Sequence, residues 1–177
     1  MGDLLSFGPT TGEVLTALPA ADLRDGDIFR IGNHTFEFDK GFTINVTAGA
    51  NKLIADGDTF TILGTSGEAT FEFDRDGSVA PGHVAVSITS IDAPEQIAEK
   101  IRQAIVADGT TGVTPIRNAN RVDLGIEGIS KAQNLVVQSS GVTVEGDAPG
   151  TLGAAGATPI AIDGSMDAPS VANAIGA

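Results

Sequence analysis

The sequence predicts an α+β fold, and three observations predict it. Short segments alternate apolar and polar residues between Asp-Gly and Gly-x turns, which is the pattern of antiparallel strands. One segment, residues 93–107, instead carries apolar residues at helical spacing. The 23 glycines are more than a helical protein tolerates. We therefore expect a twisted, mostly antiparallel β-sheet covered on one face by one main α-helix, plus a smaller β-hairpin subdomain.

Composition excludes several classes of function. With 41% hydrophobic residues the chain can bury a core, and its 177 residues suit one domain or two small ones. The net charge of −13 repels phosphate backbones and anionic lipids, so we expect no nucleic-acid partner. Because there is no cysteine, thiol catalysis and disulfides are excluded. The first residues do not read as a signal peptide, and no apolar run is long enough to span a bilayer, so we expect no membrane insertion.

The first regular element that the sequence predicts is a hairpin. Asp25-Gly26-Asp27 forms a turn, and the residues after it alternate apolar and polar side chains. Gly32-Asn33 marks a tight reversal, and Phe36-Glu37-Phe38-Asp39 returns with period two. A further strand is expected at residues 42–47.

This pattern recurs in the next stretch of chain. Asp56-Gly57-Asp58 and Phe60 repeat the spacing of Asp25-Gly26-Asp27 and Phe29, and Phe71-Glu72-Phe73-Asp74 repeats the motif at Phe36. Two matching blocks in the same order indicate internal duplication. The second hairpin has four more residues in its loop.

A third strand and the main helix follow the second hairpin. Residues 84–88 alternate as a strand should. Asp92 is a candidate N-cap, with Pro94 in the first turn and Glu95 completing a capping box. Asp108-Gly109 ends the helix. The residues expected in the core are Ile62, Phe71, Phe73, Val86, Ile97, Ile101, Ile105, Val136 and Val144.

Beyond the helix, the sequence predicts four short strands and a second helix. The strands are expected at 114–117, 121–124, 135–139 and 142–145, the last two forming a pair. Ser165-Met166-Asp167-Ala168-Pro169 echoes the start of the main helix, so a helix should begin there. We expect a fragment of a tandem array: an N-terminal flank (1–24), a partial repeat (25–55), the main β-β-β-α-β-β module (56–148) and the start of a further, truncated repeat (149–177).

Taken together, these motifs resemble a known kind of repeat. The Asp-Gly-Asp-x-Phe turn, the Phe-Glu-Phe-Asp strand at Phe71 and the Ile/Ala helix look like tandem repeats of very large bacterial surface and extracellular proteins. Their order is also similar to the flagellin insertion motif of filament proteins. The resemblance implies adhesion, spacing or surface display rather than catalysis. Residues 25–47 depart from the pattern, because no helix follows Asp39 directly.

The best candidate site is an acidic turn. Asp74 and Asp76 flank a position beside Gly77, and Asp56 and Asp58 could add oxygens from a neighbouring turn. Alternating carboxylates beside glycine are how proteins gather oxygen ligands around Ca²⁺. The alternative is a plain hairpin turn, since Asp-Gly is a common turn signal and the remaining EF-hand ligands are missing. Apart from Ca²⁺ we expect no cofactor.

No reactive centre is evident elsewhere. We interpret His34 and His83 as surface residues, because no second histidine supports a metal triad and no Ser or Cys motif supports a nucleophile. Glu37 and Glu72 should point away from the Phe face, into solvent or toward an inter-repeat contact. We therefore do not expect an enzyme.

The function expected from these observations is that of a non-catalytic structural or adhesive repeat module of a large extracellular or cell-surface bacterial protein. Its expected partners are copies of itself or neighbouring repeats. The alternatives are a calcium-dependent binding module and an accessory segment of a secreted hydrolase.

Overall fold

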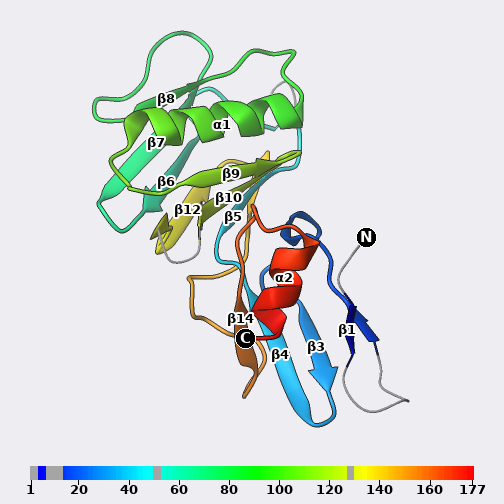
Figure 1. Ribbon diagram of the computed structural model, residues 1–177. Coiled ribbons are helices and arrows are strands. Elements are labelled where there is room, and N and C mark those ends of the chain that lie inside the picture. The colour runs from blue at the N-terminus through cyan, green and yellow to red at the C-terminus, as the bar shows by residue number, and fades with distance from the viewer. Residues whose placement is uncertain (1–3, 7–13, 50–52, 127–129) are drawn as a thin grey trace.

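The chain folds into two packed units that lie one above the other in Figure 1. This computed structural model describes residues 4–6, 14–49, 53–126 and 130–177. The strands are β1 (Leu4–Ser6), β2 (Val14–Thr16), β3 (Ile28–Ile31), β4 (His34–Asp39), β5 (Thr43–Val46), β6 (Thr59–Leu63), β7 (Glu68–Asp74), β8 (Val84–Ser87), β9 (Pro115–Asn118), β10 (Arg121–Ile126), β11 (Ser130–Lys131), β12 (Asn134–Gln138), β13 (Val142–Glu145) and β14 (Thr158–Ala161). The helices are α1 (Pro94–Asp108), α2 (Ala168–Ile175) and the short 3-10 helix η1 (Ala20–Asp22).

The upper unit, which we call the inserted unit, contains β5–β13 and α1. One sheet has the strand order β12-β6-β7-β8, and a second has β11-β10-β5-β13 with β9 paired to β10. Helix α1 packs against β8 on one side and against β5, β9 and β10 on the other. The fully buried side chains of this core include Ile44, Ile62, Phe60, Phe71, Phe73, Ile97, Ile101, Ile105 and Val122. The predicted α+β fold with one main helix is confirmed.

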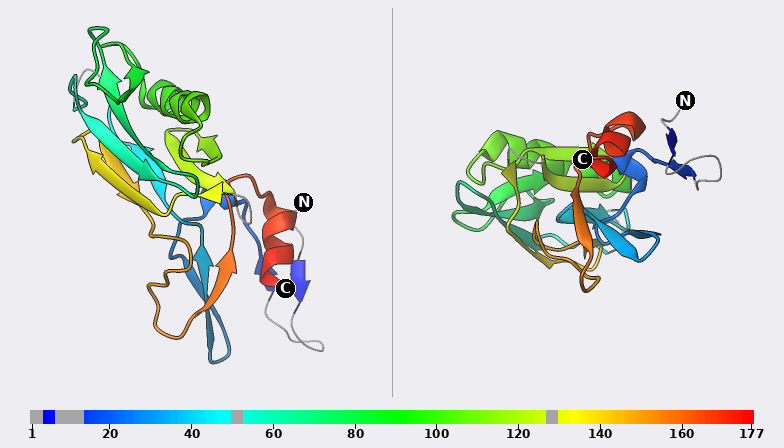
Figure 2. Two further views of the ribbon diagram at one scale, coloured as in Figure 1. Left: turned by 90° about the vertical axis from the view of Figure 1, so that its left-hand side faces the viewer. Right: turned by 60° about the horizontal axis from the view of Figure 1, so that its bottom comes forward.

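The lower unit, which we call the discontinuous unit, contains β3, β4, β14 and α2. Its sheet has the order β14-β4-β3, with β14 parallel to β4. The chain therefore leaves this unit after β4, builds the inserted unit, and returns to complete the same sheet. Figure 2 shows the two units at opposite ends of the molecule, with α2 beside the sheet of the lower one. Residues 25–39 and 158–175, expected in separate partial repeats, are neighbours here.

Both units use the same local plan. Phe29 faces Phe36 across the β3–β4 pair, and Phe60 faces Phe71 across the β6–β7 pair. The two ring pairs stack with centroid distances of 5.1 Å and 4.9 Å. A parallel strand follows each hairpin, β14 beside β4 and β8 beside β7, and each leads into a helix. The segments around Phe36 and Phe71 thus have the same conformation.

Two of the predicted core residues are exposed. Val136 is 47% exposed and Val144 is 39% exposed, whereas Leu135 and Val142 are buried. Strand β12 contains Leu-Val-Val, so alternation alone cannot say which face points inward. The remaining predicted core residues, which are Ile62, Phe71, Phe73, Val86, Ile97, Ile101 and Ile105, are buried as expected.

The predicted pairing of the last two strands of the inserted unit is wrong. Strand β12 pairs with β6, and β13 pairs with β5 in the other sheet. Closure of a hairpin would put both strands in one sheet. Instead, the Gly-containing link between them carries the chain across the core from one sheet to the other.

The N-cap of helix α1 lies one residue after the predicted N-cap, Asp92. The N-cap position is Ala93, whose N–H donates to Gln96 Oε1 at 2.9 Å. Asp92 does not cap the helix, because its Oδ2 accepts from Thr89 N at 2.7 Å and from Lys100 Nζ at 2.5 Å. The helix ends at Gly109 with φ 67°, a left-handed conformation that glycine adopts without strain.

The solvated face expected for Glu37 and Glu72 is also wrong. Glu37 is 2% exposed and Glu72 is 8% exposed. In each unit a loop that precedes the parallel strand folds over the face opposite the phenylalanines. Glu37 accepts hydrogen bonds from Gly153 N at 2.6 Å and Ala154 N at 2.7 Å. These carboxylates therefore anchor the covering loops.

Replacing Glu37 with alanine should lower the free energy of unfolding by about 2–4 kcal/mol, because two N–H groups of the covering loop lose a buried, charged acceptor. Glu37→Gln keeps one acceptor oxygen and should lose less. Urea unfolding followed by circular dichroism measures both changes. Glu68→Ala, at an exposed position on β7, is the matched control. Equal effects of Glu37→Ala and Glu68→Ala would contradict the anchoring role.

A buried ion pair joins the two units. Lys40 Nζ lies 3.1 Å from Asp123 Oδ1, and both side chains are nearly inaccessible. The ammonium also donates to Ala20 O at 2.9 Å and to Leu23 O at 3.2 Å. Burial lowers the pKa of Lys40, while the contact with Asp123 opposes that shift. On the inserted unit, Thr43 Oγ1 donates to Asp123 Oδ1 at 2.7 Å.

A second lysine reinforces this junction. Lys131 Nζ donates to Ile162 O at 3.0 Å, which links the inserted unit to the segment after β14. Asn118 Nδ2 reaches Gly164 O at 3.3 Å from the same side. The junction is thus closed by side chains from β9, β10 and β11.

Among the helices in the described residues, none is long and apolar enough to cross a membrane.

Candidate cation site

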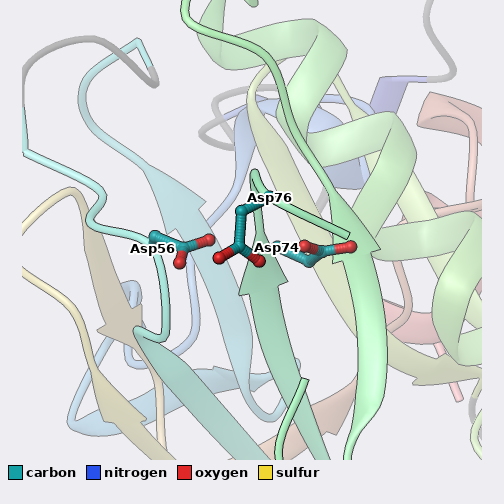
Figure 3. A group of neighbouring side chains, drawn as sticks. All are labelled: Asp56, Asp74 and Asp76. Atoms are coloured by element: carbon teal, nitrogen blue, oxygen red, sulfur yellow. The ribbon is translucent and has the colours of Figure 1, made fainter. Parts of the chain in front are cut away.

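Three of the four nominated aspartates meet at one end of the β6–β7 pair. Asp74 ends β7, Asp76 follows in the next turn, and Asp56 lies in the turn before β6. Because the strands are antiparallel, the turn entering β6 lies beside the turn leaving β7. One carboxylate oxygen from each of the three lies within 4.8 Å of the other two. Figure 3 shows the three side chains next to one another.

The fourth aspartate does not join this group. Asp58 Oδ2 accepts from Ala55 N at 2.9 Å and so closes its own turn. Asp27 does the same in the other unit, where its Oδ2 accepts from Arg24 N at 2.8 Å. The second aspartate of each Asp-Gly-Asp motif therefore has a turn-closing role.

Part of each clustered carboxylate already serves the local backbone. Asp74 Oδ1 accepts from Gly77 N at 2.7 Å, and Asp76 Oδ1 accepts from Ser78 N at 2.9 Å. Asp56 Oδ1 accepts from Arg75 N at 2.7 Å. These contacts leave the second oxygens of Asp56 and Asp76, whereas Asp74 Oδ2 also accepts from Ser87 Oγ at 3.5 Å. One oxygen from each of the three acids would be half of the smallest Ca²⁺ shell of six, which backbone carbonyls and waters commonly complete.

The discontinuous unit provides an internal comparison for this site. Asp25 and Asp39 occupy the places of Asp56 and Asp74, and Gly41 occupies the place of Asp76. Asp25 Oδ1 accepts from Lys40 N at 2.7 Å and Gly41 N at 2.8 Å. The same turn forms there without a third acid. The contact of Asp56 with the backbone after β7 therefore recurs without a cluster, whereas Asp76 has no acidic counterpart in the discontinuous unit.

The two histidines lie in different settings. His34 starts β4 at an exposed position, as expected. His83 is half-buried, and its Nδ1 lies 2.6 Å from Glu72 Oε2, which also accepts from Ala80 N at 3.0 Å. The hydrogen bond from Ala80 and then that from His83 lower the pKa of Glu72. Sequence reasoning missed this pair because strand alternation placed Glu72 in solvent.

A charged cluster on the outer side of α1 ties the helix to β9. Glu99 Oε1 lies 2.6 Å from Arg102 Nη2, and its Oε2 lies 3.0 Å from Arg117 Nε. The hydrogen bond from Arg102, helped by Gln103 and Arg117, lowers the pKa of Glu99 to about 2. The cluster is half-buried, so solvent weakens its contribution to stability.

This cluster predicts a pH dependence. The unfolded chain protonates Glu99 near its ordinary pKa of 4.5, whereas the folded chain does so only near 2. Its stabilisation is therefore complete above pH 4.5 and is lost as the pH falls toward 2. The melting temperature of Glu99→Gln should lie below that of the wild type at pH 6 and equal it near pH 2. Glu95→Gln, at an exposed position of the same helix, is the control and should show no such convergence.

Comparison with protein families, curated proteins and solved structures finds no match to this chain.

Proposed function

We propose that this chain is a non-catalytic structural or adhesive repeat module of a large extracellular or cell-surface bacterial protein, acting by self-association or by spacing. One observation carries the proposal. The same hairpin, parallel strand and helix occur twice, with one unit placed inside the other and the two joined through a buried ion pair.

The junction supports a spacing role. Lys40 bonds two carbonyls of one unit and a carboxylate of the other, so a change in the angle between the units would break buried polar contacts. Such contacts are costly to leave unmade. A module built this way transmits orientation from one unit to the next, which is what a spacer in an array requires.

The roles of the buried acids also support a structural function. Glu37, Glu72, Asp123 and Asp74 hold loops, the junction and a turn through hydrogen bonds to the chain itself. These hydrogen bonds stabilise the fold. The resemblance of the Phe-Glu-Phe-Asp motifs to repeats of bacterial surface proteins points in the same direction.

Sedimentation of the whole chain over a range of concentrations tests self-association. We expect the average mass to rise with concentration, and to rise further with salt, because the net charge of −13 makes copies repel one another. A mass that stays that of one chain at every concentration and salt level would contradict self-association.

The acidic cluster favours a second candidate function, a calcium-dependent binding module. Calorimetry with Ca²⁺ should then give saturable heat for the wild type and at least tenfold weaker binding for Asp76→Asn. Asp147→Asn, at an exposed loop position outside the cluster, is the matched control. Absence of saturable heat with the wild type, or equal binding by Asp76→Asn, would eliminate this site as a Ca²⁺ ligand set.

A further inference from the structure

The two units differ at one edge of their sheets. Strand β6 of the inserted unit is covered on its outer side by β12, which pairs with it antiparallel over five residues. Strand β3 holds the matching place in the discontinuous unit and, among the described strands, pairs with β4 alone. Because an edge strand leaves backbone N–H and C=O groups unpaired, β3 is able to accept another strand.

The phenylalanines beside the open edge of β3 are more exposed to solvent than the corresponding phenylalanines of the inserted unit. Phe60 and Phe71 are fully buried, whereas Phe29 and Phe36 are only half-buried. In the inserted unit, Val137 of β12 lies opposite Phe60, and Leu135 lies opposite Ile62. The positions that correspond to Phe60 and Ile62 in β3 are Phe29 and Ile31, and β3 also leaves Ile28 51% exposed. What the lower sheet lacks is therefore an apolar strand of this kind.

We propose that the open edge of β3 binds, antiparallel, a strand with the chemistry of β12 supplied by a second copy of this chain. The occupant is extended and uncharged over five residues, with apolar side chains placed to cover Phe29 and Ile31. This inference rests on the proposed function, because it names the surface through which copies associate.

Strand β12 of a second copy is able to make this pairing, because it is itself an edge of its sheet and, among the described strands, pairs with β6 alone. Its sequence, Asn-Leu-Val-Val-Gln, carries no charge and so brings no like-charge repulsion next to Arg30 or Asp27.

The test titrates the isotopically labelled whole chain with a synthetic peptide of residues 133–140 and follows backbone amide signals by NMR. We expect saturable shifts at Ile28–Ile31. A peptide carrying Val137→Pro should bind at least about tenfold more weakly, because proline removes a ladder donor. Absence of saturable shifts at Ile28–Ile31, including shifts confined to Thr59–Leu63 through exchange with β12, would overturn the proposal.

A protein variant separates this inference from the proposed function. Ile28→Lys puts a charge on an already exposed edge position and should weaken peptide binding at least about tenfold, with Val14→Lys, at an exposed valine of β2, as control. Sedimentation of the same variants gives the second readout. If wild type and Ile28→Lys associate equally, self-association stands and β3 is not its route. If the wild type stays monomeric while the peptide binds β3, the docking edge stands and it is self-association that fails.

Discussion

Replacing Ile101 with aspartate is expected to unfold the inserted unit. The side chain is fully buried at the centre of α1, between the two sheets of that unit. The change removes about 1.5–3 kcal/mol of apolar burial and forces a carboxylate into a site without polar partners. The total loss should exceed about 4 kcal/mol, which is a large part of the stability of an ordinary domain. Circular dichroism should show that the helical signal is already lost before any denaturant is added.

Val106→Asp provides the control for this prediction. Val106 lies in the same helix, but its side chain is 56% exposed. Aspartate there should cost at most about 1 kcal/mol, part of it from the unfavourable position of an acid near a helix C-terminus. Comparable losses in the two variants would mean that α1 does not bury the Ile101 face.

The second large effect is expected at the junction between the units. Asp123→Ala should lower the free energy of unfolding by about 3–5 kcal/mol, because it leaves the Lys40 ammonium buried without its counter-charge. Urea unfolding of the whole chain measures the loss. Thr43 and Asn118 also lose their acceptor in this variant.

A double variant separates the cost of an unpaired charge from the cost of lost packing. Lys40→Met with Asp123→Leu removes both charges while keeping apolar volume, so it should be more stable than Asp123→Ala alone. If the double variant were the less stable of the two, the ion pair itself would be the main source of stability at the junction.

Local patterns predicted the elements well, for a physical reason. The Gly32-Asn33 reversal, the two Phe-Glu-Phe-Asp strands and the spacing of Ile97, Ile101 and Ile105 are all set by neighbours in sequence. Such short-range features report turns and strand or helix periods directly. Three of the four nominated acids, Asp56, Asp74 and Asp76, also meet in space, because one antiparallel hairpin brings their turns together.

Long-range pairing could not be predicted in the same way. Strand β14 lies beside β4 although the whole inserted unit separates them in sequence. Alternation in a strand says which residues share a face, but it does not say which strand lies next to it. The sequence held one signal for this pairing, which is the similarity between the segments around Asp92 and Asp167. The strand before each of these helices, β8 or β14, lies in the same place in its sheet.

The buried glutamates were missed because burial on the second face of a strand depends on loops. Glu37 alternates with phenylalanines, and that pattern alone favours solvent. The loop that covers Glu37 comes from residues far along the chain, Gly153 and Ala154. No residue close to Glu37 in the sequence indicates that this loop covers it.

The placement of one unit inside the other determines how tension would travel along the molecule. The segments entering and leaving the inserted unit are held together where Asp147 N donates to Asp25 Oδ2 at 3.1 Å and Gly150 N donates to Asp39 Oδ2 at 2.7 Å. A pull applied to the two ends of the chain therefore loads β4, β14 and this clamp first. The inserted unit bears load only after these contacts break. The discontinuous unit therefore yields first and protects the inserted unit from the applied force.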